Sequence, residues 1–179
     1  MDDSDIIKGI KKPGGEEIAF NLLVKRYQEM LYWHIRKIVI DHDDTDDVLQ
    51  NCFIKIWKAL PEFRSDSKLY TWLYRIATNE ALTFLKQKKK MSATSLDDLS
   101  RGVADLLESD VYFDGNEIQL KLQKAILKLP AKQRIVFNLK YFEEMKYETM
   151  AEILDTSVGA LKASYHHAVK KIESMLKEH

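Results

Sequence analysis

Apolar side chains recur at three- and four-residue steps along three long stretches of the N-terminal half of the chain. This spacing places them on one face of a helix. The first stretch runs from Glu16 to Ile40, between a Pro13-Gly14-Gly15 break and an acidic break at 41–44. We predict a helix there, with a buried stripe made of Phe20, Leu23, Val24, Tyr27, Leu31, Ile35 and Ile38.

A second amphipathic helix is expected to begin near Asp44 or Thr45, either of which can cap its free N–H groups. Acidic residues at 46 and 47 favour the positive end of the helix dipole. Pro61 ends this helix. Its predicted buried stripe contains Val48, Cys52, Phe53, Ile56, Trp57 and Leu60. Its opposite face is polar apart from one isoleucine, and it carries Asp47, Gln50, Asn51, Ile54 and Lys58.

A short polar loop over residues 62–68, built around Phe63, precedes a third predicted helix from about Leu69 to Lys88. Ser67 or Ser65 can cap that helix. Its apolar side chains spread over more than one face, so they cannot all be buried against one neighbour. We expect an exposed surface that includes Thr71, Arg75, Thr78 and Asn79.

The helical periodicity stops after Met91. From Asp97 to Glu117, seven acidic residues face one basic residue, Arg101. Such a segment has too little apolar surface to form a core, so we predict a flexible acidic linker over 93–115. It would separate an N-terminal domain, 1–92, from a C-terminal domain, 116–179. The expected fold class is all-α, with two small helical domains joined by this linker.

The C-terminal domain is predicted to contain four helices, over about 118–129, 132–141, 147–154 and 158–176. The last two are separated by the short turn Asp155-Thr156-Ser157, in which Ser157 or Thr156 can cap the final helix. Two helices joined by so short a turn form a helix-turn-helix.

Composition supports a helical, soluble chain. Only six Gly and three Pro interrupt it. No apolar run approaches the roughly 20 residues that span a bilayer, and the acidic start does not resemble a signal peptide. We therefore expect a cytoplasmic protein without membrane insertion. The net charge is zero, but acidic and basic blocks alternate, which suggests one anionic and one basic partner.

Catalytic and metal chemistry finds little support in the sequence. The single Cys52 has no second thiol and is interpreted as a small buried side chain. His166 and His167 point about 100° apart on a helix and cannot chelate one ion together. The sequence contains neither a phosphate-binding glycine loop nor a nucleophile elbow. We expect no catalytic residues, metal site or cofactor, and hence no enzyme.

Two segments suit nucleic acid. The last helix is expected to expose polar, aromatic and cationic groups that fit a major groove, namely Lys162, Ser164, Tyr165, His166, His167 and Lys170. An ordinary helical hairpin with a solvated face remains the alternative. The third helix interleaves aromatic and polar groups before a lysine cluster, an arrangement that suits unstacked bases beside phosphates. Its residues are Tyr70, Trp72, Tyr74, Arg75 and Asn79.

Four motifs in order resemble the extracytoplasmic-function (ECF) sigma factors, the short members of the sigma-70 family. Residues 44–57, DTDDVLQNCFIKIW, are similar to their region 2.2 pattern D-A-x-D-x-x-Q-x-x-F-x-x-x-W. Residues 68–79, KLYTWLYRIATN, resemble the T-W-L-x-x-I-A-x-N signature of regions 2.3 and 2.4. Residues 129–134, LPAKQR, resemble the opening of region 4, and residues 158–162, VGALK, resemble the start of its recognition helix.

The resemblance implies a role for each segment. The polar face of the second helix would dock on the β′ clamp helices of core RNA polymerase, through Asp47, Gln50, Asn51, Ile54 and Lys58. The third helix and the loop before it would bind the −10 element and capture an unpaired base, through Phe63, Lys68, Thr71, Arg75, Asn79, Lys86 and Lys88. The last helix would bind the −35 element, through Lys162, Ser164, Tyr165, His167 and Lys170.

The resemblance also implies partners beyond promoter DNA. The acidic linker would thread the RNA channel of the polymerase, and the helix next to the last one would meet the β flap. Many relatives are held inactive by an anti-sigma factor, so such a partner is possible here. We expect a monomer when the protein is free.

The recognition helix departs from the family pattern. Family members commonly continue with S-R-L-x-R, whereas residues 163–167 here read ASYHH. Ala160 also replaces the usual threonine. The promoter sequence therefore cannot be transferred from the family.

Two rival functions differ in what they leave unexplained. A polymerase-independent helix-turn-helix regulator leaves the first three helices without a role. A helical protein-interaction adaptor does not predict the ordered motifs.

Overall fold

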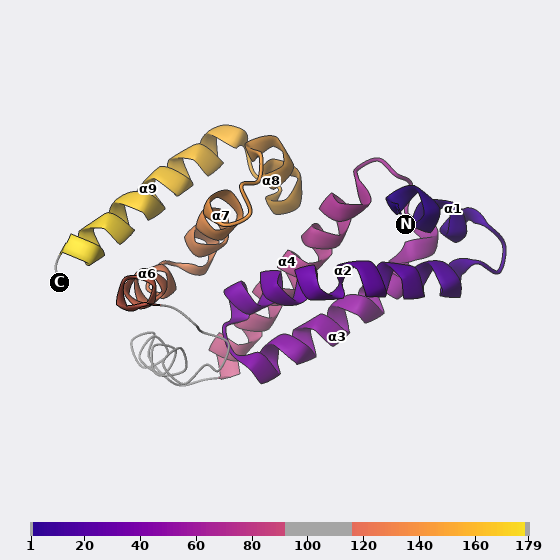
Figure 1. Cartoon of the computed structure of the whole chain (residues 1–179), viewed down its shortest axis with the longest axis horizontal. Helices are drawn as coiled ribbons and strands as arrows, with labels where there is room; N and C mark the ends of the chain where they lie inside the picture. Colours follow the sequence, from indigo (N-terminus) through magenta and orange to yellow (C-terminus); the bar gives the residue numbers. More distant parts are fainter. Residues whose placement is uncertain (1, 92–115, 178–179) are drawn as a thin grey trace. The chain divides into compact units, whose positions relative to one another are not determined.

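The computed structural model describes residues 2–91 and 116–177 (Figure 1). The chain divides into two compact units, Met1–Phe84 and Leu85–His179. Every regular element among the described residues is a helix, which confirms the predicted all-helical fold. The expected acidic linker, 93–115, lies outside the described residues.

The chain begins with a helix that the sequence analysis did not predict. Helix α1 spans Asp3–Lys11. It is closed at its start by Asp2, whose N–H donates to the Asp5 carboxylate at 3.1 Å. Its buried side chains are Ile6 and Ile10, one turn apart. Two apolar positions are too few to establish a helical period, which is why the pattern gave no helix before residue 16.

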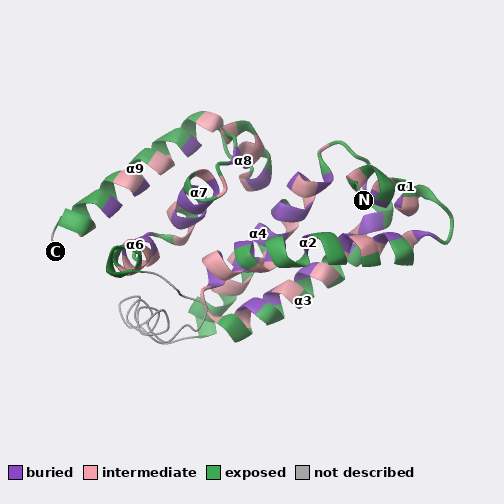
Figure 2. Cartoon of the chain, viewed as in Figure 1, coloured by how far each residue is buried: buried purple, intermediate pink, exposed green. Residues whose placement is uncertain are grey.

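Three long helices follow: α2 (Glu16–Val39), α3 (His42–Ala59) and α4 (Leu69–Met91). The first unit contains α2, α3 and the part of α4 up to Phe84. A short 3-10 helix, η1 (Leu60–Glu62), connects α3 to the loop before α4. Buried residues form a stripe along each long helix (Figure 2). The prediction that Asp44 or Thr45 caps α3 is wrong, because Asp41 accepts from the Asp44 N–H at 2.9 Å.

A buried histidine joins α2 to α4. The Nε2 atom of His34 lies 2.7 Å from the Thr78 hydroxyl oxygen, and this hydroxyl donates to the carbonyl of Tyr74 at 2.7 Å. Because the hydroxyl proton is committed to Tyr74, His34 must donate through Nε2, as a neutral imidazole. Burial, with a smaller contribution from Lys37, lowers the pKa of His34 from 6.5 to about 3.

Because burial lowers the pKa of His34, we predict that acid destabilises the first unit. Below pH 6.5 the unfolded chain binds a proton at His34 that the folded chain does not, so stability falls as the pH drops from 6.5 towards 3. Between pH 6.5 and 5 the loss is expected to be about 2 kcal/mol. Urea unfolding at both pH values should show this loss in the natural chain and its absence in His34→Gln. Equal pH dependence in the two proteins would contradict the assignment.

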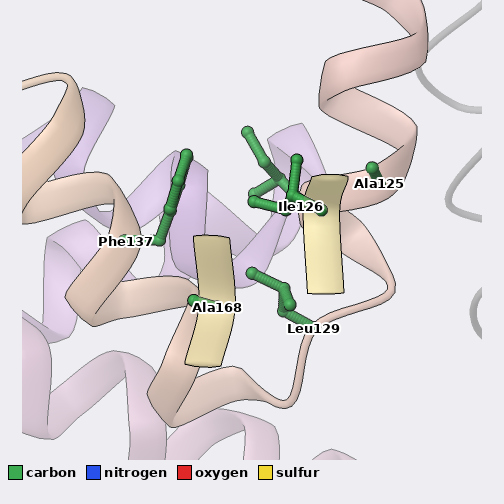
Figure 3. Close-up of a cluster of buried hydrophobic side chains, with 6 residues drawn as sticks. Ala125, Ile126, Leu129, Phe137 and Ala168 are labelled. Carbon is green, nitrogen blue, oxygen red and sulfur yellow. The ribbon is translucent and has the colours of Figure 1, made fainter. Parts of the chain in front are cut away.

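The second unit contains α6 (Glu117–Leu127), α7 (Ala131–Tyr141), α8 (Tyr147–Leu154) and α9 (Val158–Lys177). The four expected helices are confirmed, with bounds within about two residues. Ser157 caps α9, because its hydroxyl oxygen accepts from the Ala160 N–H at 3.2 Å. The apolar core of α6, α7 and α9 (Figure 3) comprises Ala125, Ile126, Leu129, Phe137, Ala168 and Ile172.

A buried arginine closes the C-terminal end of α6. Arg134 on α7 donates from Nη1 to the carbonyl oxygens of Leu127 and Leu129, at 3.3 and 3.5 Å. These carbonyls lie at a helix end, where intrahelical partners are lacking. Burial lowers the pKa of Arg134 to about 10. The arginine of the LPAKQR motif therefore has a structural role in joining α6 to α7.

None of the helices among the described residues combines the length and the apolar character that spanning a bilayer requires.

Candidate nucleic-acid interface

One long face of α3 is open to solvent. The five residues expected to bind a protein partner all lie there and are all exposed: Asp47, Gln50, Asn51, Ile54 and Lys58. We call these five residues the α3 outer face. Ile54 keeps 47% of its surface exposed. On the inner side of α3, Val48, Cys52 and Ile56 are buried, and Lys55 forms an ion pair with Glu80 of α4.

Trp57 extends the apolar part of this face. The prediction that it is buried is wrong, because 42% of its surface is exposed. Its ring rests on Phe20 of α2, with the ring centroids 5.0 Å apart. Trp57 follows Ile54 by three residues, so both side chains point to the same side of α3. An exposed isoleucine and tryptophan beside amide and carboxylate groups suit the buried centre of a protein–protein contact.

A small pocket opens where η1 leads into the loop before α4. It has a volume of about 250 Å³ and is lined by Ala59, Glu62, Phe63, Arg64, Asp66, Ser67 and Trp72. Two of these side chains form an aromatic pair, since the Phe63 and Trp72 rings lie 5.0 Å apart and are tilted. Phe63 is only 8% exposed. Glu62, Arg64 and Asp66 are exposed and polar.

A row of polar and cationic side chains runs along α4 from this pocket. Lys68, Arg75, Asn79 and Lys86 are all exposed, and their spacing of seven, four and seven residues keeps them on one side of the helix. We call these four residues the α4 row. Lys88 is also exposed, but its position in the sequence places it on a different side.

Thr71 does not belong to this surface. It was expected to be exposed but is only 4% exposed. With Tyr74 and Thr78 it forms a buried side of α4 at three- and four-residue steps, so the expected exposure of Thr78 is also wrong. Tyr70, which lies 4.3 Å from the Tyr74 ring, and Trp72 remain half-buried.

The outer side of α9 carries most of its predicted contact residues. Lys162, His167 and Lys170 are exposed and Ser164 is half-buried. Tyr165 is also half-buried, because its ring stacks on Phe137 with centroids 5.9 Å apart and packs against the apolar core. Within the described residues, no group of three acidic, histidine or cysteine side chains could hold a metal ion.

One of these cations, Lys162, lies beside an aromatic ring. Lys162 Nζ lies 5.7 Å from the centroid of Tyr147, at the start of α8. Lys140 Nζ of α7 lies 4.7 Å from the same centroid and donates to the carbonyl of Met145 at 3.2 Å. The Tyr147 ring therefore contacts one lysine from α7 and one from α9. Neither Tyr147 nor Lys140 lies in a recognisable motif, so neither could be assigned to this surface from the sequence.

Both units match models of one protein family. The model of Sigma-70 region 2 matches residues 23–91, and that of Sigma-70 region 4 matches residues 119–172. The chain belongs to the sigma-70 family of RNA polymerase sigma factors. The first match contains the α3 outer face, the pocket and the α4 row, and the second contains most of α6 to α9. As a sigma factor, the protein directs transcription initiation, with core RNA polymerase and promoter DNA as partners.

Relatives of known identity place this sigma factor in the ECF group. It is 31% identical over 184 residues to the RNA polymerase sigma-H factor of Pseudomonas aeruginosa, covering 97% of this chain and 93% of that protein. It is 30% identical over 182 residues to the ECF RNA polymerase sigma-E factor of Escherichia coli, covering 97% and 94%. Matches in both units disfavour the rival interpretation as a regulator that acts without polymerase.

Solved structures share the fold. CnrH, in complex with the cytosolic domain of CnrY, superposes with a TM-score of 0.70 at 24% identity, covering 99% of this chain and 97% of that one. The sigma factor RpoE of Bartonella quintana, in complex with the anti-sigma factor NepR, gives a TM-score of 0.67 at 20% identity, covering 88% and 96%.

Proposed function

We propose that this sigma factor attaches to core polymerase through the α3 outer face, which docks on the β′ clamp helices. Three features support this assignment. All five residues of the face are exposed, Ile54 and Trp57 supply apolar area at its centre, and the ion pair between Lys55 and Glu80 fastens α3 to α4. A rigid helix with an apolar centre and a polar rim is the usual anatomy of a specific interface.

The pocket beside η1 is proposed to take one unpaired base of the −10 element. Extracting a base from a duplex costs a few kcal/mol, and stacking on an aromatic ring returns about 1–3 kcal/mol. Phe63 and Trp72 supply such rings inside a pocket of about 250 Å³. This pocket is the observation that carries the assignment. The cations of the α4 row would hold the phosphates of the opened strand, with Asn79 near base edges, whereas Lys88 lies on a different side of α4.

The second unit is proposed to read the −35 element with α9, through Lys162, Ser164, His167 and Lys170. Tyr165 would contribute through the part of its side chain that is not stacked on Phe137. Helix α8, which precedes α9, would contact the β flap. In this proposal residues 1–92 act at the polymerase and the −10 element, 116–179 act at the −35 element, and the acidic segment 93–115 occupies the RNA channel.

The contact between Lys162 and Tyr147 leads us to predict that removing the Tyr147 ring weakens binding to the −35 element. A cation beside an exposed aromatic ring gains about 0.5–1 kcal/mol, so losing the ring should weaken binding of a −35 duplex about two- to fivefold. Tyr147→Leu is expected to show this loss, and Tyr147→Phe, which keeps the ring, is expected to bind normally. Fluorescence anisotropy with a labelled duplex measures both. A Phe variant as weak as the Leu variant would assign the effect to the hydroxyl instead.

An anti-sigma factor is proposed as the regulator. Both neighbouring structures described above are complexes with a second protein, named as an anti-sigma factor in one of them. The exposed side chains of Ile54 and Trp57 would suit such a partner as well as they suit polymerase. In this proposal the protein is a cytoplasmic initiation factor that is monomeric when free. It is neither an enzyme nor dependent on a cofactor.

Chromatography with core polymerase from the same organism tests the proposed function. The sigma factor should elute together with core, and the mixture should protect a promoter fragment at both the −10 and the −35 element. A protein that stays separate from core but binds duplex DNA by itself would overturn the proposal and favour the helix-turn-helix regulator.

A further inference from the structure

Helix α1 lies outside the segment that matches the region 2 model, which begins at residue 23. It is nevertheless firmly built into the first unit. Ile6 is fully buried and Ile10 is 7% exposed. Helix α1 packs against α2 and also against η1. Figure 1 shows it at the end of the unit where α3 leads through η1 towards α4.

A polar latch fixes the start of α1 to α2. The Tyr27 hydroxyl lies 2.8 Å from each carboxylate oxygen of Asp3, to which it donates. Nε of Arg26 pairs with the same carboxylate at 2.9 Å. Burial, together with Asp3, raises the pKa of Tyr27 to about 12. Tyr27 therefore stays a hydrogen-bond donor at neutral pH.

Two glycines bring α1 very close to the start of α2. A Cβ atom on Gly9 would lie 3.0 Å from the Cβ of Ala19, and one on Gly15 would lie 2.4 Å from the carbonyl oxygen of Gly9. The second distance is shorter than any real contact allows. Larger residues at these positions would push α1 away, so the sequence is suited to one close position of this helix.

The contact with η1 links α1 to the base pocket. Leu60, the first residue of η1, is buried. Its carbonyl accepts from the Phe63 N–H at 3.1 Å, which fixes the backbone of Phe63 relative to η1. Glu62 and Phe63 then form part of the pocket lining. A shift of η1 would therefore move that part of the lining relative to Trp72 on α4.

We propose that α1 is a positioning element for the −10 base pocket, holding η1 so that Phe63 and Trp72 enclose one unpaired base. The inference rests on the proposed function of that pocket. Packing of α1 is directed at α2 and η1, whereas core binding is assigned to the outer face of α3. Loss of α1 packing should therefore impair base capture and promoter opening while core binding persists.

The test compares two buried isoleucines with the same chemistry. Ile10→Ala removes packing from α1, and Ile38→Ala removes packing from the far end of α2, where Ile38 is also buried. Each full-length variant is assembled with core polymerase and given a single-stranded −10 oligonucleotide that carries 2-aminopurine, whose fluorescence reports stacking. Ile10→Ala should weaken oligonucleotide binding about tenfold, with core affinity within twofold of normal. Ile38→Ala should leave both unchanged.

A milder variant keeps the test decisive if Ile10→Ala fails to fold. Tyr27→Phe removes only the hydrogen bond to Asp3 and is expected to weaken oligonucleotide binding about threefold. Equal oligonucleotide binding by Tyr27→Phe and the natural chain, or equal loss in Ile10→Ala and Ile38→Ala, would overturn the role of α1. Failure of the natural chain to bind core or the oligonucleotide would instead overturn the proposed function.

Discussion

Replacing Ile54 with glutamate is expected to weaken binding of this sigma factor to core RNA polymerase by about 30-fold or more. The few hot-spot residues near the centre of an interface cost about 2 kcal/mol or more when they are altered, and we expect Ile54 to be one of them. Ile54 lies at the middle of the α3 outer face with 47% of its surface exposed. The new carboxylate would have to lose its water on docking, with no cation assigned to meet it. Competition binding to labelled core polymerase measures the loss.

Ile18 of α2 offers a matched control. It is an isoleucine of the same unit, 67% exposed, and it lies outside the α3 outer face. Ile18→Glu makes the same change of charge and should leave core affinity within about twofold of normal. Both variants should unfold at nearly the natural urea concentration, because exposed substitutions change stability by about 0.5 kcal/mol or less. Similar losses of affinity in the two variants would contradict the placement of the interface.

Replacing Trp72 with alanine is expected to weaken capture of the −10 single strand by about 5- to 150-fold. The range follows from the 1–3 kcal/mol that stacking of one base contributes. Trp72 lines the pocket with Phe63, and it is half-buried. Open-complex formation on a duplex promoter should fall, measured by permanganate reactivity of the unpaired thymines. Binding of a −35 duplex should not change, because the second unit carries it.

Trp33 of α2 supplies the control for this prediction. It is a tryptophan of the same unit with 39% of its surface exposed, and it is not among the residues that line the pocket. Trp33→Ala should retain normal capture of the single strand. If Trp72→Ala opens promoters at the natural rate, the base is held elsewhere and the pocket assignment is wrong.

The helices of this protein were predictable because apolar spacing is a local property. The bounds of α2 and of α6 to α9 follow from steps of three and four residues, interrupted by Pro and Gly before α2, by Pro130 between α6 and α7, and by short polar stretches elsewhere. Helix α1 escaped prediction, since its burial depends on α2 and η1 rather than on a repeating pattern. The acidic cap of α3 was misplaced for a related reason: 41, 43, 44, 46 and 47 are all Asp, and only geometry selects Asp41.

Candidate surfaces were less predictable than helices. Periodicity gives the relative direction of side chains on one helix, but it does not say where the neighbouring helices pack. Trp57 and Thr71 were therefore assigned to the wrong environments, and Tyr165 was expected to face solvent although it stacks on Phe137. The pocket beside η1 arises from Phe63 and Trp72 meeting across a loop. Such a contact leaves no trace in either residue's own stretch of sequence.

Run-off transcription tests the central claim most directly. Core polymerase from the same organism is incubated with genomic promoter fragments, with no sigma factor, with this protein, or with its Gln50→Ala Asn51→Ala variant. Both residues are exposed on the α3 outer face, so the variant should fold normally. The natural chain should yield discrete new transcripts, and the variant should yield almost none. Transcripts of equal strength from both proteins would contradict recruitment through α3, and no transcripts from the natural chain would contradict its role as an initiation factor.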